Sequence, residues 1–262
     1  MGALTGFVGD LVVARMRSEL PARECSSALR RGLRGCRGSY SGGHVRHFSC
    51  GTSAGLALVT ARPVIGVLAL QGDVREHAAM LVACGAEPRA VRRPEELTGL
   101  AGIVIPGGES TTIDKLSRIF ELRDPLVAAI RAGLPAYGSC AGMIMLANRL
   151  ADAPPDQQTF GGLNVTVRRN AFGRQTESFE ADLTGGWPAG EPFRAVFIRA
   201  PEVVAYGPEI EVLATVPRAD GSEHVVAVRQ GSLLATAFHP EVAGDARIHA
   251  YFVELACNVA AA

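Results

Sequence analysis

The sequence lacks any continuous apolar run long enough to cross a membrane, and it has no excess of positive or negative charge. A membrane-spanning helix needs roughly 18 consecutive apolar residues, and no stretch of this chain reaches that length. The formal net charge is zero, whereas a general nucleic-acid binder carries a basic patch or stripe. These two absences predict a soluble protein that binds neither membranes nor nucleic acid.

Cysteine pairs at metal-binding or redox spacing are also missing. The chain has six cysteines, but they form no Cys-x-x-Cys pair and no His/Cys set with zinc-ligand intervals. The hydrophobic fraction is 48%, enough for a sizeable core that needs no disulfide framework. We therefore expect no metal, no cofactor for the reaction itself, and a reducing, cytoplasmic location.

Charge and residue composition divide the chain into two unequal parts. Residues 1–62 contain nine arginines against three acidic residues, with Gly and Ser scattered between them. Such a segment buries too little apolar surface to offset its ordering entropy, so we predict that it is disordered or loosely attached. Its composition is that of an organelle transit peptide. The alternative is a mis-assigned start, or a dispensable extension, upstream of a domain over residues 63–262.

Strands and helices alternate regularly from Val64 onward. A short apolar run typical of a buried strand covers 64–70, and further strands are predicted over 87–92, 102–108 and 134–140. Helical patterns cover 73–85 and 141–150, and another helix is predicted to follow the loop ESTT (109–112) and to end at about 132. This order predicts an α/β fold with a doubly wound, mostly parallel sheet flanked by helices. The second half adds strands, some antiparallel, over 162–169, 178–183, 194–201, 210–216, 223–230 and 232–240, and a last helix over about 245–259.

The sharpest local signal is the sequence YGSCAGM, which places Cys140 between a predicted strand and a predicted helix. A Gly-x-Cys-x-Gly turn holds a nucleophile at the carboxyl end of the strand, where open parallel sheets bind their ligands. The following helix N-terminus favours a thiolate, and its backbone N–H groups can bind a developing oxyanion. Taken alone, a cysteine in this position is more often a small core residue.

A base for this nucleophile is supplied by the sequence FHPE near the end of the last predicted strand. Cysteine at its ordinary pKa is only a few per cent thiolate at neutral pH, so an efficient nucleophile needs a base beside it. His239 is the candidate base and general acid, and Glu241 follows two residues later. Residues i and i+2 of an extended backbone point to the same side, so Glu241 is predicted to hold the ring of His239. His-Pro-Glu alone is common in surface turns. The prediction of a catalytic role depends on its occurrence together with the Gly-x-Cys-x-Gly turn.

The loop PGGEST, from Pro106 to Thr111, is the third feature of interest. Two glycines at the carboxyl end of a strand allow backbone N–H groups to face a ligand. Gly108 could supply one oxyanion-hole donor opposite that of Ala141. The Lys-Ser/Thr ending of a phosphate loop is absent.

Two further cysteines and two further histidines after Val64 are predicted to have structural and not catalytic roles. Cys84 and Cys257 lie within helical patterns and are predicted to be packing residues. His77 and His249 also lie on predicted helices, where a satisfied or solvated imidazole is the default expectation.

Six ordered motifs together resemble a known family. GVLALQGDVREH, PGGESTT, GSCAGM, RRNAFGRQ, FIRAP and FHPE are similar to those of the class I (triad) glutamine amidotransferases and, within them, of the glutaminase subunits of two-component pyridoxal 5′-phosphate synthases. The resemblance runs from about Val64 to the C-terminus and leaves residues 1–62 unexplained. It implies a glutaminase that hydrolyses L-glutamine to glutamate and ammonia for vitamin B6 biosynthesis.

The resemblance also implies roles for particular residues. Those matching the catalytic triad are Cys140, His239 and Glu241, and those matching the glutamine site are Gly108, Glu109, Ser110, Arg169, Ile198 and Arg199. An Arg fork suits the substrate α-carboxylate, and the sequence leaves open whether Arg169, Arg174 or Arg199 binds it. Ser139 and Met143 are expected to vary around the elbow without touching its chemistry.

A partner is the last implication of the resemblance. It is a (β/α)8-barrel pyridoxal 5′-phosphate synthase subunit that receives the ammonia without its release and activates a glutaminase that is poorly active alone. Pyridoxal phosphate is then the product of the complex and not a cofactor of this subunit. Gln71 and the following helix, with Arg75, Glu76 and His77, are expected to form a docking face.

Three other functions compete with this interpretation. A cysteine hydrolase or chaperone-like protein on a related sheet would use an elbow cysteine without glutamine. A glutaminase could serve a different synthase, against which only RRNAFGRQ and FIRAP argue. A non-catalytic regulatory subunit could keep the fold, although an intact Cys140, His239 and Glu241 set counts against it.

Overall fold

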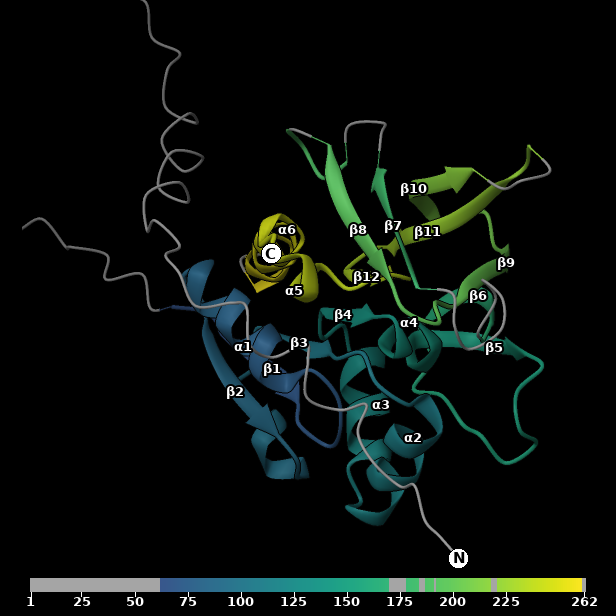
Figure 1. The fold of residues 1–262 in the computed structure, drawn as a ribbon. Coiled ribbons are helices and arrows are strands. Elements are labelled where there is room, and N and C mark those ends of the chain that lie inside the picture. Colours follow the sequence, from purple (N-terminus) through teal and green to yellow (C-terminus); the bar gives the residue numbers. More distant parts are fainter. Residues whose placement is uncertain (1–61, 170–177, 184–186, 191, 218–220, 261–262) are drawn as a thin grey trace, which may run out of the picture. The chain divides into compact units, whose positions relative to one another are not determined.

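A ten-stranded sheet is the framework of the computed structural model (Figure 1). The structure describes residues 62–169, 178–183, 187–190, 192–217 and 221–260. The predictions for residues 1–61 and for Arg174 lie outside the described residues. None of the described helices is long and apolar enough to span a membrane.

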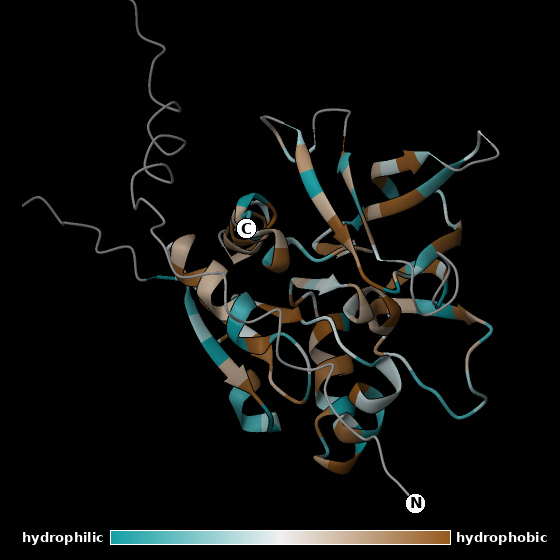
Figure 2. Cartoon of the chain, viewed as in Figure 1, coloured by the Kyte–Doolittle hydropathy of each residue, from teal (hydrophilic) through white to brown (hydrophobic). Residues whose placement is uncertain are grey.

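Parallel strands form the half of the sheet that carries the site. They lie in the order β2 (Glu87–Val91), β1 (Val64–Leu68), β3 (Gly102–Ile105), β4 (Ala136–Ser139) and β12 (Leu233–Thr236). All four residues of β3 and of β4 are buried, and Figure 2 shows β1 and β3 as largely hydrophobic. Short apolar runs form such strands because both faces are covered by helices.

Antiparallel pairing extends the sheet beyond β12. The next strands are β11 (Glu223–Gln230), β9 (Glu202–Tyr206), β6 (Leu163–Arg168) and β5 (Ala147–Ala151), and β10 (Glu211–Pro217) also pairs with β11. A separate antiparallel pair joins β7 (Phe179–Leu183) to β8 (Phe193–Phe197). The predicted doubly wound sheet with added antiparallel strands is therefore confirmed.

Helices cover the sheet in two groups (Figure 1). One group packs together and consists of α1 (Val74–Ala83), α5 (Pro240–Ala243) and α6 (Arg247–Ala260). The other consists of α2 (Ser110–Ile119), α3 (Arg123–Arg131) and α4 (Ala141–Leu146), with the 3-10 turn η2 (Pro94–Leu97) beside α3. Because β3 and β4 are neighbouring parallel strands, the loop that follows β3 and the turn that follows β4 lie at the same edge of the sheet.

The helix predicted over 141–150 is wrong in its second half. Helix α4 ends at Leu146, and Ala147–Ala151 forms β5, which pairs with β6. Arg149 donates from Nε to Thr166 Oγ1 at 3.0 Å and from Nη2 to Asn164 Oδ1 at 2.9 Å. Pairing with a strand distant in the sequence overrides the local helical pattern.

The single helix predicted to end at about 132 is also wrong. The sequence ESTT is not a loop before it, because α2 begins at Ser110, and a second helix, α3, begins at Arg123. Glu121, in the break, has a positive φ of 54°. Pro125 has no N–H and its ring clashes with the carbonyl of residue i−4, so an unbroken helix cannot pass this point.

A second strand of the sheet, besides β5, was not predicted. β9 lies between β11 and β6, with Val167 opposite Val203 in one pair and Val225 opposite Val203 in the other. Its residues are buried at one end and exposed at the other. A half-buried pattern of this kind has no clear period, so only its neighbours identify it as a strand.

Candidate active site

Cys140 lies on a sharp turn between β4 and α4. Its φ of 49° and ψ of −101° are unusual for a non-glycine residue. The backbone is held by the Cys140 N–H, which donates to Thr236 O at 2.8 Å. A Cβ added at Gly138 would collide with the backbone of Gly142, and one added at Gly142 would collide with the Ile105 carbonyl. Both glycines of the predicted elbow are therefore required by close approach of strand, turn and helix.

His239 and Glu241 make the contact that the sequence predicted, but through a different backbone. His239 Nδ1 lies 2.7 Å from Glu241 Oε1, and the Glu241 side chain is fully buried. The two residues are not on an extended strand: β12 ends at Thr236, His239 precedes α5, and Glu241 lies in its first turn. The predicted extended geometry is wrong because Pro240 begins a helical turn. The backbone is positioned by the His239 N–H, which donates to Val196 O at 2.9 Å.

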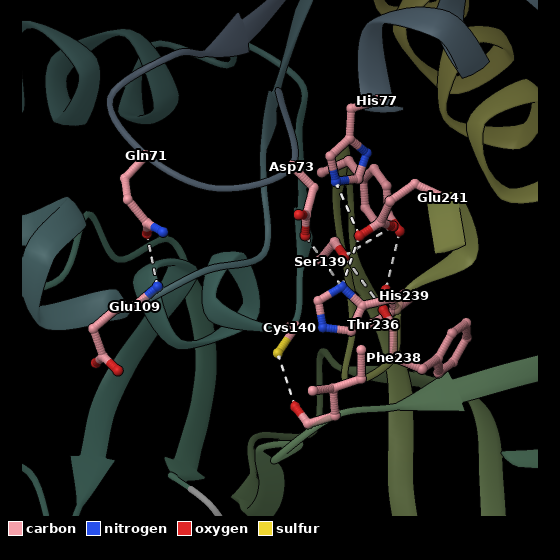
Figure 3. Close-up of polar contacts among 12 residues, drawn as sticks. Gln71, Asp73, His77, Glu109, Ser139, Cys140, Thr236, Phe238, His239 and Glu241 are labelled. Carbon is pink, nitrogen blue, oxygen red and sulfur yellow. Dashed lines mark hydrogen bonds and ion pairs between the residues drawn. The ribbon is translucent and has the colours of Figure 1, made fainter. Parts of the chain in front are cut away.

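The imidazole of His239 lies between the sulfur and two carboxylates (Figure 3). Nδ1 faces Glu241 and also lies 3.6 Å from Asp73 Oδ2, while the other ring nitrogen lies on the Cys140 side. Burial lowers the pKa of His239, but hydrogen bonds with Asp73, Cys140 and Glu241 outweigh it and raise this pKa to about 12. The ring is thus held as an imidazolium at neutral pH.

Asp73, His239 and Glu241 also have potential metal-ligand atoms within 4.8 Å of one another. The shortest approach in this set is the 2.7 Å hydrogen bond between His239 Nδ1 and Glu241 Oε1. That bond already occupies the atoms that a cation would need. The set is therefore suited to acid–base chemistry at His239.

A pocket opens on the other side of Cys140. Its cavity volume is about 30 Å³, and it is lined by Gly108, Glu109, Ser110, Cys140, Ala141, Ile144, Arg169, Ile198 and Arg199. The predicted glutamine-site and oxyanion-hole residues that the structure describes all lie here, and Ile144 is the addition that the sequence did not predict. Cys140 Sγ lies 3.9 Å from Ile198 O. The structure thus brings four separate segments of the chain to one sulfur atom.

An ion pair spans this pocket. Arg169 Nη2 donates to Glu109 Oε1 at 2.8 Å, and Arg169 Nη1 donates to Gln157 Oε1 at 3.0 Å. Gln157 Nε2 in turn donates to Ser110 Oγ at 3.0 Å. Gln157 was not predicted, because the loop between β5 and β6 has no motif that points to the site.

The Gly107-Gly108 loop packs directly against the candidate catalytic groups. A Cβ at Gly107 would collide with the ring of His239, and Gly108 has a φ of 143°. The Glu109 N–H donates to Gln71 Oε1 at 2.7 Å (Figure 3). The Gln71 side chain thus packs against this loop and accepts a hydrogen bond from it.

The predicted docking face needs a correction. Arg75 and Glu76 are exposed on α1, but His77 is completely buried. His77 Nε2 lies 3.6 Å from Glu241 Oε1, on the side of the carboxylate away from the pocket. Its place on the helix gives the reason: Val74, His77 and Leu81 follow helical spacing on one stripe, and that stripe faces the sheet.

Two further expectations are wrong. Ser139 touches the candidate triad, since its Oγ lies 3.4 Å from Glu241 Oε2 and 3.3 Å from Phe238 O. Cys257 is exposed and is not a packing residue. Cys84, in contrast, packs against the core as predicted.

Comparisons with known proteins agree on one family. The model of the SNO glutamine amidotransferase family matches residues 67–258. A pyridoxal 5′-phosphate synthase subunit PdxT from Rhodococcus opacus (strain B4) is 58% identical over 200 residues, covering 76% of this chain and 99% of that protein. The protein of the same name from Salinispora arenicola (strain CNS-205) is 60% identical over 193 residues, covering 74% and 96%.

Solved structures show the same fold. A crystal structure described as a glutamine amidotransferase aligns with a TM-score of 0.66 at 47% identity, covering 73% of this chain and 98% of that one. The structure of PurLQS from Thermotoga maritima aligns with a TM-score of 0.55 at 19% identity, covering 76% and 99%. At that identity the second match concerns the fold alone.

Proposed function

Because this chain belongs to the SNO glutamine amidotransferase family and is therefore a glutaminase enzyme subunit, we propose that it hydrolyses L-glutamine through Cys140, His239 and Glu241. The observation that carries the proposal is the position of Cys140. Its sulfur lines a pocket formed by the predicted glutamine-site residues, and a buried His239–Glu241 pair with a 2.7 Å contact lies behind it.

The first half of the proposed reaction forms a thioester. An imidazolium at His239 stabilises the thiolate of Cys140, which attacks the carboxamide carbon of glutamine. The negative charge moves to the amide oxygen, where the N–H groups of Gly108 and Ala141 stabilise it. His239 then gives its Nε2 proton to the departing nitrogen, the C–N bond breaks, and ammonia leaves.

Hydrolysis completes the cycle. The neutral His239 takes a proton from water, and the resulting hydroxide attacks the thioester carbon. Collapse of the second tetrahedral intermediate breaks the C–S bond, releases glutamate and restores the thiolate–imidazolium pair. Glu241 accepts the hydrogen bond from Nδ1 throughout, so the ring keeps the orientation that both proton transfers need.

Glutamine recognition is assigned to the ion pair that spans the pocket. The guanidinium of Arg169 and the carboxylate of Glu109 face each other at 2.8 Å. We assign the α-carboxylate of glutamine to Arg169 and its α-ammonium to Glu109. The substrate carboxylate then replaces Glu109 as the partner of Arg169, and the substrate ammonium replaces Arg169 as the partner of Glu109. A cavity of about 30 Å³ is far smaller than a typical ligand site, roughly 300 Å³ or more. Substrate entry therefore requires the pocket to widen, and in this assignment the two ends of the substrate separate the Arg169–Glu109 pair.

The proposed partner is a (β/α)8-barrel pyridoxal 5′-phosphate synthase subunit. Relatives at 58% and 60% identity are named as subunits of that synthase. A closed pocket in the isolated chain is consistent with activation by a partner. Ammonia passed directly into the barrel would avoid protonation in water.

The test measures ammonia and glutamate release from L-glutamine, with and without the barrel subunit, for the wild type and for Cys140→Ala. We expect release that depends on the partner and is lost in the variant. Release unaffected by Cys140→Ala would reject the nucleophile assignment. Release by the wild type that is indifferent to the barrel subunit would reject the partner.

A further inference from the structure

Two buried histidines continue the line of polar groups behind Glu241. His77 on α1 and His249 on α6 both have no exposed surface. His77 Nδ1 lies 2.9 Å from His249 Nε2, and His77 Nε2 lies 3.6 Å from Glu241 Oε1. His239, Glu241, His77 and His249 therefore form one continuous row from the pocket into the core, and neither of the last two has a role in the reaction described above.

Both rings are neutral. Burial, followed by the charges of His249 and His239, lowers the pKa of His77 well below its usual range. Burial also lowers the pKa of His249 to about 4, although Asp245 opposes it. A neutral imidazole has one N–H donor and one acceptor nitrogen, so the row has a definite direction of donation.

The carboxylate sets that direction. Ionised Glu241 can only accept, so the proton of His77 is favoured on Nε2, which faces Oε1. His77 Nδ1 is then an acceptor, and the 2.9 Å contact requires His249 Nε2 to be the donor. The opposite tautomer of His77 would place a lone pair against a buried carboxylate. A hydrogen bond from His249 Nε2 to His77 Nδ1 is therefore compatible with the tautomer of His77 that Glu241 favours.

The rings are held in place by packing. Tyr137 lies edge-on to His77 and to His249, with ring centroids 6.2 and 5.7 Å away. At 3.6 Å the His77 Nε2–Glu241 contact is longer than a hydrogen bond. His77 Nε2 is buried and has no hydrogen-bond partner among the described residues. The carboxylate is the acceptor within reach, and contacts around a catalytic group commonly tighten when substrate binds.

We propose that His77 is a positioning residue of the glutaminase, which holds the Glu241 carboxylate by facing it with Nε2–H while its Nδ1 accepts a hydrogen bond from His249. This inference rests on the proposed function. His77 does not reach the substrate: it acts through Glu241, which orients the ring of His239. A packing role alone would be served better by an apolar side chain, since burying two imidazoles carries a desolvation cost.

The experiment compares two replacements of His77 in the full chain, assayed with the barrel subunit. In His77→Gln the amide nitrogen takes the place of Nε2 and keeps a donor. In His77→Leu the volume is similar and the donor is lost. We expect kcat of His77→Leu to fall about 10- to 100-fold with little change in KM for glutamine. We expect His77→Gln to stay within about threefold of the wild type.

Variants of His249 provide a second, independent measurement. His249→Leu should lower kcat, and His249→Gln should not. The double variant His77→Leu/His249→Leu should be no slower than His77→Leu alone, because His249 acts only through His77. If His77→Leu does not fold, as judged by its thermal unfolding, the two His249 variants provide the test. A lower kcat in His249→Leu but not in His249→Gln supports the proposal, and equal kcat values in the two variants contradict it.

A control separates catalysis from stability. His224 on β11 and Glu202 form a similar His–carboxylate pair at 3.0 Å, and neither residue lines the pocket at Cys140. His224→Leu should lower the unfolding temperature and leave kcat unchanged. A wild-type kcat in His77→Leu, or a loss in His77→Gln as large as in His77→Leu, would overturn the role of His77. Absence of glutamine hydrolysis by the wild type with its partner would instead refute the proposed function.

Discussion

At the scale of single residues, the candidate site depends on conformations that other parts of the chain enforce. Cys140 has a φ of 49°, and a non-glycine residue held in such a region costs on the order of 1–3 kcal/mol. The cost is tolerated because the Cys140 N–H donates to Thr236 O and its carbonyl accepts from the Met143 N–H at 3.0 Å. This conformation accompanies a buried cysteine whose side chain lines the pocket.

His239 provides a prediction about pH. Its pKa is about 12 in the folded protein against an ordinary 6.5, because hydrogen bonds with Asp73, Cys140 and Glu241 outweigh the opposing effect of burial. A raised folded-state pKa contributes stability that is fully present below the unfolded pKa and is lost as pH rises through the folded one. We therefore expect the free energy of unfolding to fall between about pH 7 and about pH 9.

Denaturant unfolding of the wild type and of His239→Gln at both pH values checks this expectation. The variant lacks the titrating ring, so its free energy of unfolding should fall less over the same interval. Equal changes in the two proteins would show that His239 is not protonated in the folded state.

At the scale of elements, the elbow between β4 and α4 leaves no room for a larger residue at either of its glycines. Gly142→Ala places a Cβ against the Ile105 carbonyl, which is backbone and cannot move aside. We expect a loss of about 1–3 kcal/mol in the free energy of unfolding, together with loss of glutaminase activity. Urea unfolding and the ammonia assay measure the two effects.

Gly85→Ala is the matched control for this substitution. Gly85 follows α1, has a φ of 80°, and has no heavy atom within 4 Å of an added Cβ. Its replacement strains only the local backbone, so it should leave kcat unchanged. An equal effect of both substitutions on activity would contradict the packing argument.

The loop between β5 and β6 supports the pocket through one side chain. Gln157 links Arg169 to Ser110 by hydrogen bonds of 3.0 Å each. In Gln157→Ala, Arg169 loses a neutral acceptor, and we expect KM for glutamine to rise about 3- to 10-fold with a smaller change in kcat. Steady-state kinetics with the barrel subunit measure both constants.

Gln158→Ala is the control in the same loop. The side chain of Gln158 is exposed, and its backbone N–H donates to Asp114 Oδ2 at 3.1 Å. That bond survives the substitution, so KM should remain at the wild-type value. A rise in KM in both variants would assign the effect to the loop as a whole.

At the scale of the whole molecule, the candidate site lies entirely within residues that the family model matches, 67–258. The division of the chain at residues 62 and 63 remains a prediction. A chain beginning at Arg62 should show the same unfolding temperature and the same partner-stimulated kcat as the full chain. Loss of either property would show that residues 1–61 contribute to the domain.

The predicted docking face on α1 can be tested by replacing one of its exposed residues. Glu76 lies on α1, on the outside of the helix that carries His77 on the inside. Glu76→Ala should lower activity with the barrel subunit, whereas Glu95→Ala on η2, also exposed, should not. Gln71 is unsuitable for this purpose, because its contact with the Glu109 N–H affects the pocket directly. Unchanged stimulation in Glu76→Ala would remove α1 from the docking surface.

The sequence alone was sufficient for features that depend on local pattern. Short apolar runs predicted the parallel strands, because a strand buried on both faces needs no alternation. The glycines around Cys140 and in the loop before Glu109 predicted two tight turns at the ends of strands. Motif order supplied the family, and with it every residue predicted to line the pocket.

Other features were decided only by tertiary structure. β5 formed from a helical pattern because β6 was available to pair with it, and Gln157 entered the site from a loop without a motif. His77 and His249 are 172 residues apart in the sequence and meet at 2.9 Å. Their contact exists because α1 and α6 pack on the same side of the sheet, which brings a histidine from each buried stripe together, with His77 next to Glu241. Spacing along one helix can predict that a histidine is buried, but its partner is determined by the packing of segments distant in the sequence.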